Sequence, residues 1–203
     1  MTITLHKNDL PDDLDLGQIV AIDTETMGLN PHRDRLCLVQ LSSGDGTAHL
    51  VQISKGQKRA PNLARLLKSR QVEKLFHFGR FDIAVLLHAF GALATPVYCT
   101  KIASKLTRTF TDRHGLRVLC QDLISVDISK QQQSSDWGAE ELTEAQLEYA
   151  ASDVLYLHRI REVLDGRLKR EERDRIAAEC FRFLPYRAML DLRGWPEEDI
   201  FAH

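Results

Sequence analysis

The sequence predicts an α/β domain built on a mixed sheet of five strands, flanked by helices and followed by a helical C-terminal tail. Short apolar runs alternate with segments that repeat leucine at helical spacing. The first three apolar runs follow one another, and the Gly-Asp-Gly at 44–46 indicates a hairpin between the second and third, because these residues tolerate positive φ. A length of 203 residues suits one such domain, so we expect a single domain over residues 1–203.

Each strand is expected where an apolar run is too short for a helix. The run from Ile19 to Ile22 is typical of a buried strand, and the next two runs continue it through the hairpin. Later runs alternate with helices, which is the pattern of parallel strands joined by crossovers. The expected strands are 18–23, 35–43, 47–53, 72–78 and 96–100.

The helices are expected from leucine spacing and from residues that begin or end a helix. Pro61 suits a helix start, Gly91 suits a helix end, and Thr143 with Gln146 forms a capping box that opens the longest helix. The tail from about residue 167 is also helical in pattern. The expected helices are 61–70, 80–91, 101–107, 115–126 and 143–166, and the tail is 167–203.

Composition indicates an ordinary globular protein with 43% hydrophobic and 28% charged residues. The apolar runs are far shorter than the ~18 residues that span a bilayer, and the first residues lack a secretory pattern, so we expect a cytoplasmic protein without a membrane partner. The four cysteines are scattered, which favours free thiols. A net charge of −2 provides no basic footprint for long nucleic acid, and the basic stretch 101–117 equally fits a solvated surface.

Four acidic residues follow or interrupt apolar segments. Asp23 and Glu25 end the first strand in "DTET" and, at positions i and i+2, share one face about 7 Å apart. Asp82 follows the fourth strand in "HFGRFD". Asp153 lies within the longest helix in "YAASD", one turn after Tyr149.

A shared pocket of four acids requires a counter-charge. Each like-charged pair at ~4 Å costs up to ~4 kcal/mol at an effective dielectric of 20, and divalent cations remove this cost. Oxygen ligands favour Mg²⁺ or Mn²⁺, and two such ions ~4 Å apart are the usual apparatus for phosphodiester hydrolysis. Each acid by itself also fits a helix cap or a surface charge.

These three motifs resemble, in order and residue type, those of the DEDD exonucleases. The branch of that superfamily with a histidine in the third motif places it five residues before the last Asp, where this chain has Glu148; Tyr149, four residues before, matches the tyrosine branch. The chain therefore resembles a DEDDy 3′–5′ exonuclease over about residues 17–165. The segments "DTETMGLNPHRDRLCLVQLSS" and "KQQQSSDWG" further resemble the ribonuclease D group, and the size and motifs are most similar to the nano-RNase C family.

The resemblance implies a fold, a chemistry and a substrate. It implies an RNase H-like exonuclease fold in which Asp23, Glu25, Asp82 and Asp153 hold two divalent metal ions, Mg²⁺ or Mn²⁺. Tyr149 would orient the attacking water or accept its proton with the help of the metal, since a phenol with a pKa near 10 is not a phenolate at neutral pH. The implied substrates are very short RNAs, above all 5′-phosphorylated dinucleotides, which are hydrolysed to 5′-mononucleotides.

Substrate contacts are expected on two loops and one histidine. Met27 and Leu29, after the first acids, could wedge against the bases or belong to the core. Lys130, Gln133 and Ser135 could bind phosphate, with Trp137 packing behind them, or form an ordinary polar loop. Many relatives carry an asparagine a few residues before the second-motif Asp, where this chain has His77. His77 is as well explained by a strand-end histidine whose hydrogen bonds are made within the fold as by a substrate ligand.

Several alternatives stay open from the sequence. The same catalytic set serves a ribonuclease D-like enzyme that trims longer RNA 3′ ends or acts on DNA, and related folds include endonucleases and inactive binding modules. Only about 40 residues follow the longest helix, which we expect to leave no room for an added RNA-binding domain. These residues are rich in large apolar side chains, which would be covered either by folding back on the domain or by a second subunit. The resemblance to nano-RNase C, a family that assembles into rings, favours a homo-oligomer.

Overall fold

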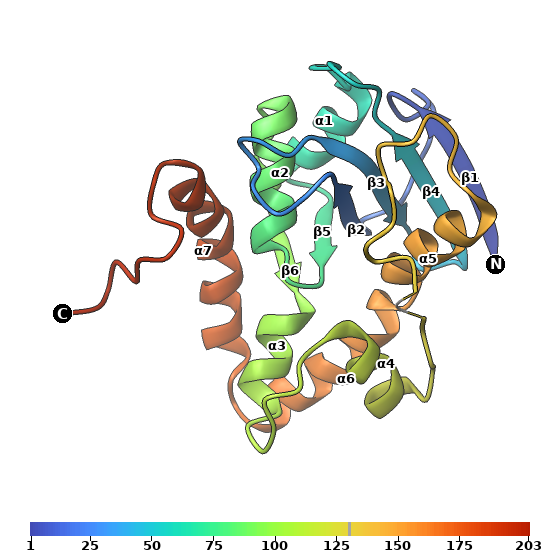
Figure 1. Cartoon of the computed structure of the whole chain (residues 1–203). Helices are drawn as coiled ribbons and strands as arrows, with labels where there is room; N and C mark the ends of the chain where they lie inside the picture. Colours follow the sequence, from blue (N-terminus) through green and yellow to red (C-terminus); the bar gives the residue numbers. More distant parts are fainter. Residues whose placement is uncertain (130) are drawn as a thin grey trace.

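A computed structural model describes residues 1–129 and 131–203 and shows a mixed sheet with helices packed around it (Figure 1). The strands lie in the order β1-β4-β3-β2-β5-β6. Their bounds are β1 Thr2–Lys7, β2 Ile19–Thr26, β3 Leu36–Ser42, β4 Thr47–Gln52, β5 Glu73–Phe76 and β6 Val97–Cys99.

Strand pairing confirms the mixed sheet and corrects the number of strands from five to six. β2, β3 and β4 pair antiparallel, with glycines 44 and 46 at positive φ in the expected hairpin turn. β2, β5 and β6 pair parallel. The strand that sequence reasoning missed, β1, pairs parallel with β4 at the sheet edge, and none of its residues is fully buried. Its local pattern is therefore weak, and the pairing with β4 establishes it as a strand.

The helices follow the expected positions with one difference. Their bounds are α1 Pro61–Lys68, α2 Arg80–Phe90, α3 Thr100–Thr107, α4 Leu116–Ile124, α5 Glu144–Leu155, α6 Leu157–Arg170 and α7 Asp174–Leu192. Thr143 and Gln146 form the expected capping box of α5. The single helix expected over 143–166 is instead two helices, because Tyr156, at φ −103° and ψ −5°, breaks the helical path between α5 and α6.

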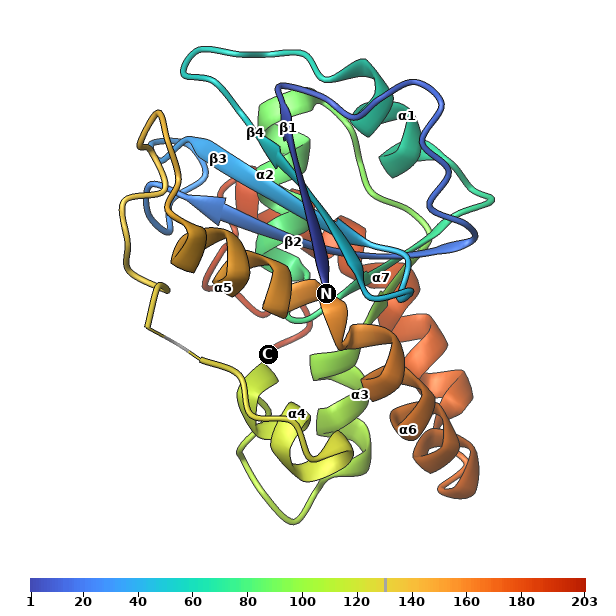
Figure 2. The same ribbon diagram turned by 90° about the vertical axis from the view of Figure 1, so that its right-hand side faces the viewer.

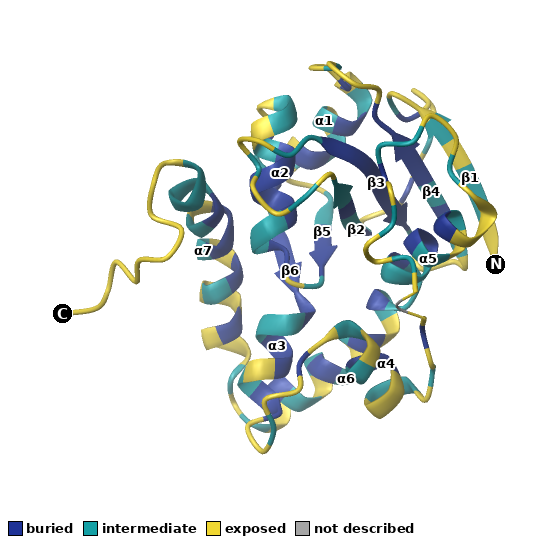
Figure 3. Cartoon of the chain, in the orientation of Figure 1, coloured by how far each residue is buried: buried dark blue, intermediate teal, exposed yellow. Residues whose placement is uncertain are grey.

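Helices pack on both sides of the sheet. α5 lies across β1 to β4, and α2 packs on β2 and β3. Figure 2 views the sheet with β1 toward the reader and shows α1 and α5 on its two sides. Every residue of β3 is buried, and Figure 3 shows the buried core running through the central strands. Asp23 and Glu25, which lie in β2, are therefore held by the buried sheet rather than by loops alone.

The C-terminal tail is helical as far as Leu192 and packs on the domain. α7 contacts α2, α3 and β6, and Phe181 and Leu184 are buried in that contact. Residues 193–203 are exposed, including Trp195 and Phe201 (Figure 3). The helix of the tail therefore folds back on the domain, as one of the two interpretations expects, while the homo-oligomer stays a prediction.

Two expectations from composition also meet the structure. Cys37, Cys99 and Cys120 are buried free thiols, and Cys180 is a partly exposed free thiol, as expected from their spacing. Across the described ranges, we find no helix with the length and apolar character needed to cross a membrane.

Candidate active site

Two parallel strands bring the first three acids to one edge of the sheet. Asp23 and Glu25 lie in the second half of β2 and point to the same face, because they are two residues apart in a strand. β5 runs parallel beside β2, and the chain turns directly from β5 into α2, whose first turn carries Asp82. Parallel strands end at the same edge, so Asp82 lies beside the acids of β2.

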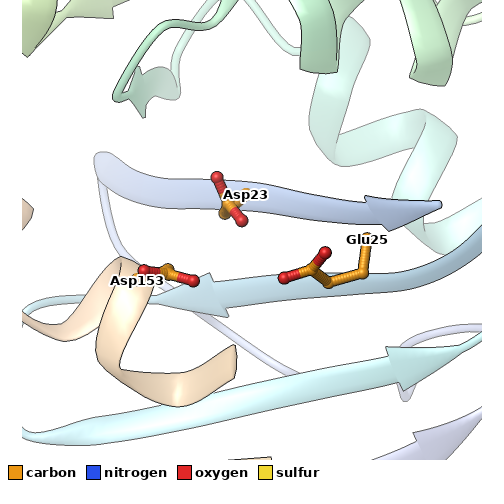
Figure 4. Close-up of side chains that lie close together, drawn as sticks. All are labelled: Asp23, Glu25 and Asp153. Carbon is orange, nitrogen blue, oxygen red and sulfur yellow. The ribbon is translucent and has the colours of Figure 1, made fainter. Parts of the chain in front are cut away.

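Helix α5 supplies the fourth acid and the tyrosine from across the sheet. Tyr149 and Asp153 are one turn apart on α5 and face the same direction. One carboxylate oxygen from each of Asp23, Glu25 and Asp153 lies within 4.8 Å of the other two. Figure 4 shows these three side chains close together. Asp82 is 4% exposed and lines the same cleft. The structure thus brings all four acids and the tyrosine together.

The carboxyl groups resist ionisation in this arrangement. Burial, and then the neighbouring Asp82, Asp153 and Glu25, raise the pKa of Asp23 well above its usual range. Burial and the same neighbours raise the pKa of Glu25 to about 9. Burial also raises the pKa values of Asp82 and Asp153. Within the described ranges none of these four acids forms an ion pair, and such a concentration of acidic groups favours a bound cation.

The donor set fits a hard divalent cation. Its ligand atoms are all carboxylate oxygens, which are the atoms that Mg²⁺ and Mn²⁺ prefer. Their mutual distances allow several of them to reach one ion, and the raised pKa values mark the charge that such an ion would neutralise. The residues present therefore fit the metal chemistry expected from the sequence.

Two polar residues that sequence reasoning missed hold the acids in place. The Thr24 hydroxyl donates a hydrogen bond to Asp82 Oδ1 at 2.7 Å, which joins β2 to α2. Gln40 lies opposite Asp23 in the β2–β3 register, and its Nε2 donates to Asp23 Oδ2 at 3.4 Å. Thr24 is named by the motif itself, but the role of Gln40 depends on strand pairing that no local pattern reveals.

Tyr149 lies beside the acids as a neutral phenol. Burial, followed by the charges of Asp153, Glu25 and Asp23, raises its pKa above the ordinary value near 10. Its ring lies 6.0 Å from the ring of Trp137, which is buried behind it as expected. Tyr149 is thus a hydroxyl group at neutral pH, able both to donate and to accept a hydrogen bond.

The acids lie in a cleft of about 700 Å³ that also contains the predicted substrate contacts. Leu29 is 85% exposed and Met27 is 53% exposed, so neither belongs to the core, and the core interpretation of these residues is wrong. Gln133 and Ser135 also line the cleft, while Lys130 lies outside the described residues. The described residues expected at the site that line this cleft are Asp23, Glu25, Met27, Leu29, His77, Asp82, Gln133, Ser135, Tyr149 and Asp153.

The two substrate loops are tied to each other. Arg35, at the end of the loop that carries Met27 and Leu29, donates to the carbonyl of Gly138 at 3.1 Å. Gly138 lies close to Met27, because a Cβ at this position would lie 2.5 Å from Met27 Sδ and the methionine side chain would have to shift. Gln146 holds the other end by donating to Ser135 Oγ at 3.2 Å. The loops therefore form one wall of the cleft rather than two independent segments.

His77 lines the cleft but is partly satisfied within the fold. Its Nδ1 is 2.9 Å from the hydroxyl of Thr100. Burial, and then the nearby Lys101 ammonium, lower its pKa to about 3, so the imidazole is neutral. Both of its interpretations keep support: the Thr100 contact fits a strand-end histidine, and its place in the cleft fits a substrate ligand.

Phe78 and Lys101 also line the cleft, and sequence reasoning did not select either. Phe78 is an exposed aromatic residue between β5 and Asp82, and Lys101, in the first turn of α3, has its ammonium 4.0 Å from the centre of that ring. The available signal was an aromatic residue placed directly before the second-motif acid in "HFGRFD".

Known proteins match both the sequence and the fold of this chain. A model of the 3′–5′ exonuclease family matches residues 7–169. Ribonuclease D of Acidiphilium cryptum is 37% identical over 172 residues, which are 84% of this chain and 43% of that protein. The chain spans about two-fifths of the length of the ribonuclease D proteins that it matches.

Two solved structures match over the full chain. Brucella melitensis NrnC with bound Mg²⁺ is 65% identical, covers 100% of both chains and superimposes with a TM-score of 0.96. The same Brucella protein bound to pGG is 66% identical, with a TM-score of 0.97 and coverage of 100% of this chain and 99% of that one. Similarity of this degree extends through the tail as well as the acidic cleft.

Proposed function

This chain belongs to the 3′–5′ exonuclease family, in its ribonuclease D group, and on that premise we propose that it hydrolyses very short RNA, down to dinucleotides, to 5′-mononucleotides. The observation that carries this proposal is the cluster of Asp23, Glu25 and Asp153, whose carboxylate oxygens lie within 4.8 Å of one another in an open cleft. A cluster with unbalanced charge at a substrate-sized cleft suits metal-assisted phosphodiester hydrolysis.

The four acids would hold two divalent metal ions, Mg²⁺ or Mn²⁺. Such ions, when bound, lower the pKa of water enough to supply hydroxide near neutral pH, and they neutralise charge on the leaving oxygen. Asp23 and Glu25 present their carboxylates from the rigid strand β2, while Asp153 does so from α5. Thr24 and Gln40 restrain the directions of the Asp82 and Asp23 carboxylates. The chain thus sets the geometry before substrate arrives.

Tyr149 would orient the attacking water. Because its phenol keeps its proton, the hydroxyl oxygen can accept a hydrogen bond from water while the proton is donated to a neighbouring oxygen. The water oxygen forms a bond to the scissile phosphorus, and the bond from phosphorus to the 3′-oxygen of the preceding nucleotide breaks. The leaving oxygen takes up a proton, and the released product is a 5′-mononucleotide.

Short substrates are favoured by charge and by the bound ligand of a relative. A net charge of −2 leaves few cations for the many phosphate contacts that long RNA requires. Brucella NrnC, 66% identical, is bound to the dinucleotide pGG. In this chain we propose that Met27 and Leu29 wedge against the bases, and that the loop of Lys130, Gln133 and Ser135 captures a 5′-phosphate. His77 would contact substrate from the facing wall.

The ribonuclease D relatives support a second candidate, trimming of longer RNA or DNA 3′ ends. A length series separates the two: kcat/KM is measured with Mg²⁺ for a 5′-phosphorylated dinucleotide and for 20-mers of RNA and DNA, with Asp153→Asn prepared in parallel to exclude a contaminating nuclease. We expect faster cleavage of the dinucleotide and a shallow dependence on salt. Faster cleavage of a 20-mer, with binding that falls steeply with salt, would favour the second candidate.

We further propose that the protein is a cytoplasmic homo-oligomer. The exposed end of the tail carries Trp195, Ile200 and Phe201, which would be shielded from water by a neighbouring subunit. Phe201 packs on Phe183 of α7 with ring centres 5.7 Å apart, so the apolar surface is continuous with the helix. Light scattering at micromolar concentration tests this assembly, and a mass near 23.1 kDa would contradict it.

A further inference from the structure

Phe78 adopts a backbone conformation that a bulky residue rarely takes. Its φ is +64°, in the left-handed region. The turn leaves little freedom, because a side chain at Gly79 would lie 2.6 Å from Phe76 Cβ. This tight turn links β5 to α2 and so places Asp82, and it also leaves the Phe78 ring 49% exposed. A large apolar ring in water at a strained position requires a reason.

Lys101 supports the ring from one side. Its ammonium lies 4.0 Å from the ring centre, a favourable cation–π contact that fixes the orientation of the ring. The face with the ammonium is covered, so the exposed surface belongs to the other face and the ring edge. Lys101 also lines the acidic cleft, where it adds a positive charge.

The ring stands on the rim between two cavities. Phe78 lines the acidic cleft and also a second cavity of about 760 Å³. Leu29 lies on the same rim, while Arg80 and His32 line the second cavity. Leu29 and Phe78 both line the acidic cleft, so a nucleotide bound beside the acids can contact them.

We propose that Phe78 stacks on the base of the nucleotide on the 5′ side of the scissile phosphate, with Lys101 holding the ring in place. An exposed aromatic face is the usual platform for an unpaired base, and stacking tolerates any base because each has a π face. This inference rests on the proposed exonuclease function and adds a specific subsite to it. Phe78 and Leu29 would together separate and hold the two bases of a dinucleotide.

The decisive test removes the ring or the base, singly and together. Phe78→Asn suits this purpose, because asparagine tolerates positive φ and should preserve the turn. Steady-state kinetics would use three 5′-phosphorylated dinucleotides: intact, abasic on the 5′ side, and abasic on the 3′ side. We expect Phe78→Asn to raise KM roughly 10-fold for the intact and 3′-abasic substrates, with little change in kcat. On the 5′-abasic substrate the variant and wild type should be alike.

Two further variants sharpen the test. Phe78→Trp should keep the KM of wild type, and Lys101→Met should raise KM by a smaller factor than Phe78→Asn does. Phe110→Ala is the matched control, since Phe110 is also exposed and has the Arg108 guanidinium 5.8 Å from its ring centre but does not line the acidic cleft. It should leave all three substrates unaffected.

Other results would overturn the inference in distinguishable ways. An equal loss on all three substrates, or a lowered melting temperature, would make Phe78 a structural residue. A loss that vanishes on the 3′-abasic substrate would place the ring at the other base. If wild type cleaves only 20-mers, the dinucleotide proposal fails, and the same abasic series at the last two positions of the 20-mer still tests Phe78.

A binding measurement gives a readout independent of turnover. In the Asp153→Asn background, a dinucleotide with 2-aminopurine on its 5′ side should change fluorescence when it stacks on Phe78. The change should disappear with Phe78→Asn and persist with Phe110→Ala. Binding without any fluorescence change in the parent protein would contradict stacking.

Discussion

The sheet contains a buried lysine whose charge is fully hydrogen-bonded and a buried group of acids whose like charges lie close together. Lys74, in β5, is fully buried, and its ammonium donates to the carbonyls of Ser69, Val72 and Thr95 at 2.7, 2.6 and 2.6 Å. All three of its protons therefore have partners. The acids near the carboxyl ends of β2 and β5 are instead gathered with their like charges close together. The fold itself supplies the partners of the Lys74 ammonium, whereas the acids would be balanced by a bound cation.

The difference separates a structural site from a functional one. The Lys74 carbonyls come from the end of α1, the turn before β5 and the loop before β6, so the ammonium joins three segments of the fold. Burial lowers the pKa of Lys74 to about 8, which is the remaining cost of its position. The acidic cluster instead brings like charges of β2, α2 and α5 together, and a bound cation would balance them. We therefore expect substitutions of the acids, and not substitutions of Lys74, to change the stability that the protein gains from added metal.

The largest expected effect comes from breaking the acidic set. Asp153→Asn should lower kcat at least ~10³-fold, because a metal ligand acts on the transition state directly. Tyr149→Phe should also reduce kcat severely but retain most of the Mg²⁺-induced rise in melting temperature. Single-turnover kinetics and thermal melts with and without Mg²⁺ measure both. Near-normal turnover in Asp153→Asn would remove the basis for the metal assignment.

Removing the Lys74 ammonium should affect the stability of the fold instead of turnover. Lys74→Met removes three charge-assisted hydrogen bonds and leaves buried carbonyls unpaired, so the free energy of unfolding should fall by ~3 kcal/mol or more. Urea unfolding in EDTA and in Mg²⁺ should give the same loss. Lys68→Met, at an exposed position on α1, is the control and should change stability by less than ~0.5 kcal/mol. A Lys74→Met loss that Mg²⁺ repairs would join the two sites.

The pH dependence of the metal-free protein follows from the raised carboxyl pKa values. A carboxyl group whose pKa is higher in the fold, about 9 for Glu25, binds its proton more tightly there than in the unfolded chain. This stabilisation is complete below about pH 4 and is lost as the pH rises toward 9. Metal-free protein should therefore melt at lower temperature at pH 8 than at pH 5. Melting curves in saturating Mg²⁺ should show a flatter dependence, and an identical slope would speak against a shared site.

The smallest effect should come from relieving a single charge. Asp82→Asn keeps an oxygen that can accept the Thr24 hydrogen bond while removing one negative charge. In EDTA the variant should melt at or above the temperature of wild type, by about 2–4 °C if ~1 kcal/mol is relieved. It should also gain less from Mg²⁺ than wild type gains. A lower melting temperature in EDTA together with an unchanged Mg²⁺ response would contradict the metal site.

Local spacing was sufficient to pair the site residues that lie within one element. Asp23 and Glu25 share a face because a strand repeats every two residues, and Tyr149 and Asp153 share one because a helix repeats nearly every four. The capping box at Thr143 likewise depends on residues three apart. These features belong to single elements, so the sequence by itself determines them. Which acids meet was inferred from the resemblance to exonucleases, and the structure does bring them together.

Features that need contacts between distant segments were decided only by tertiary structure. β1 exists because β4 pairs with it, and the break at Tyr156 separates two helices whose sequence pattern is continuous. Lys74 is buried because three carbonyls from separate segments converge on it. The partners of Gln40 and Phe78 come from neighbouring elements in the same way. No local period encodes such contacts, because the free energy that stabilises them arises only after the chain has folded.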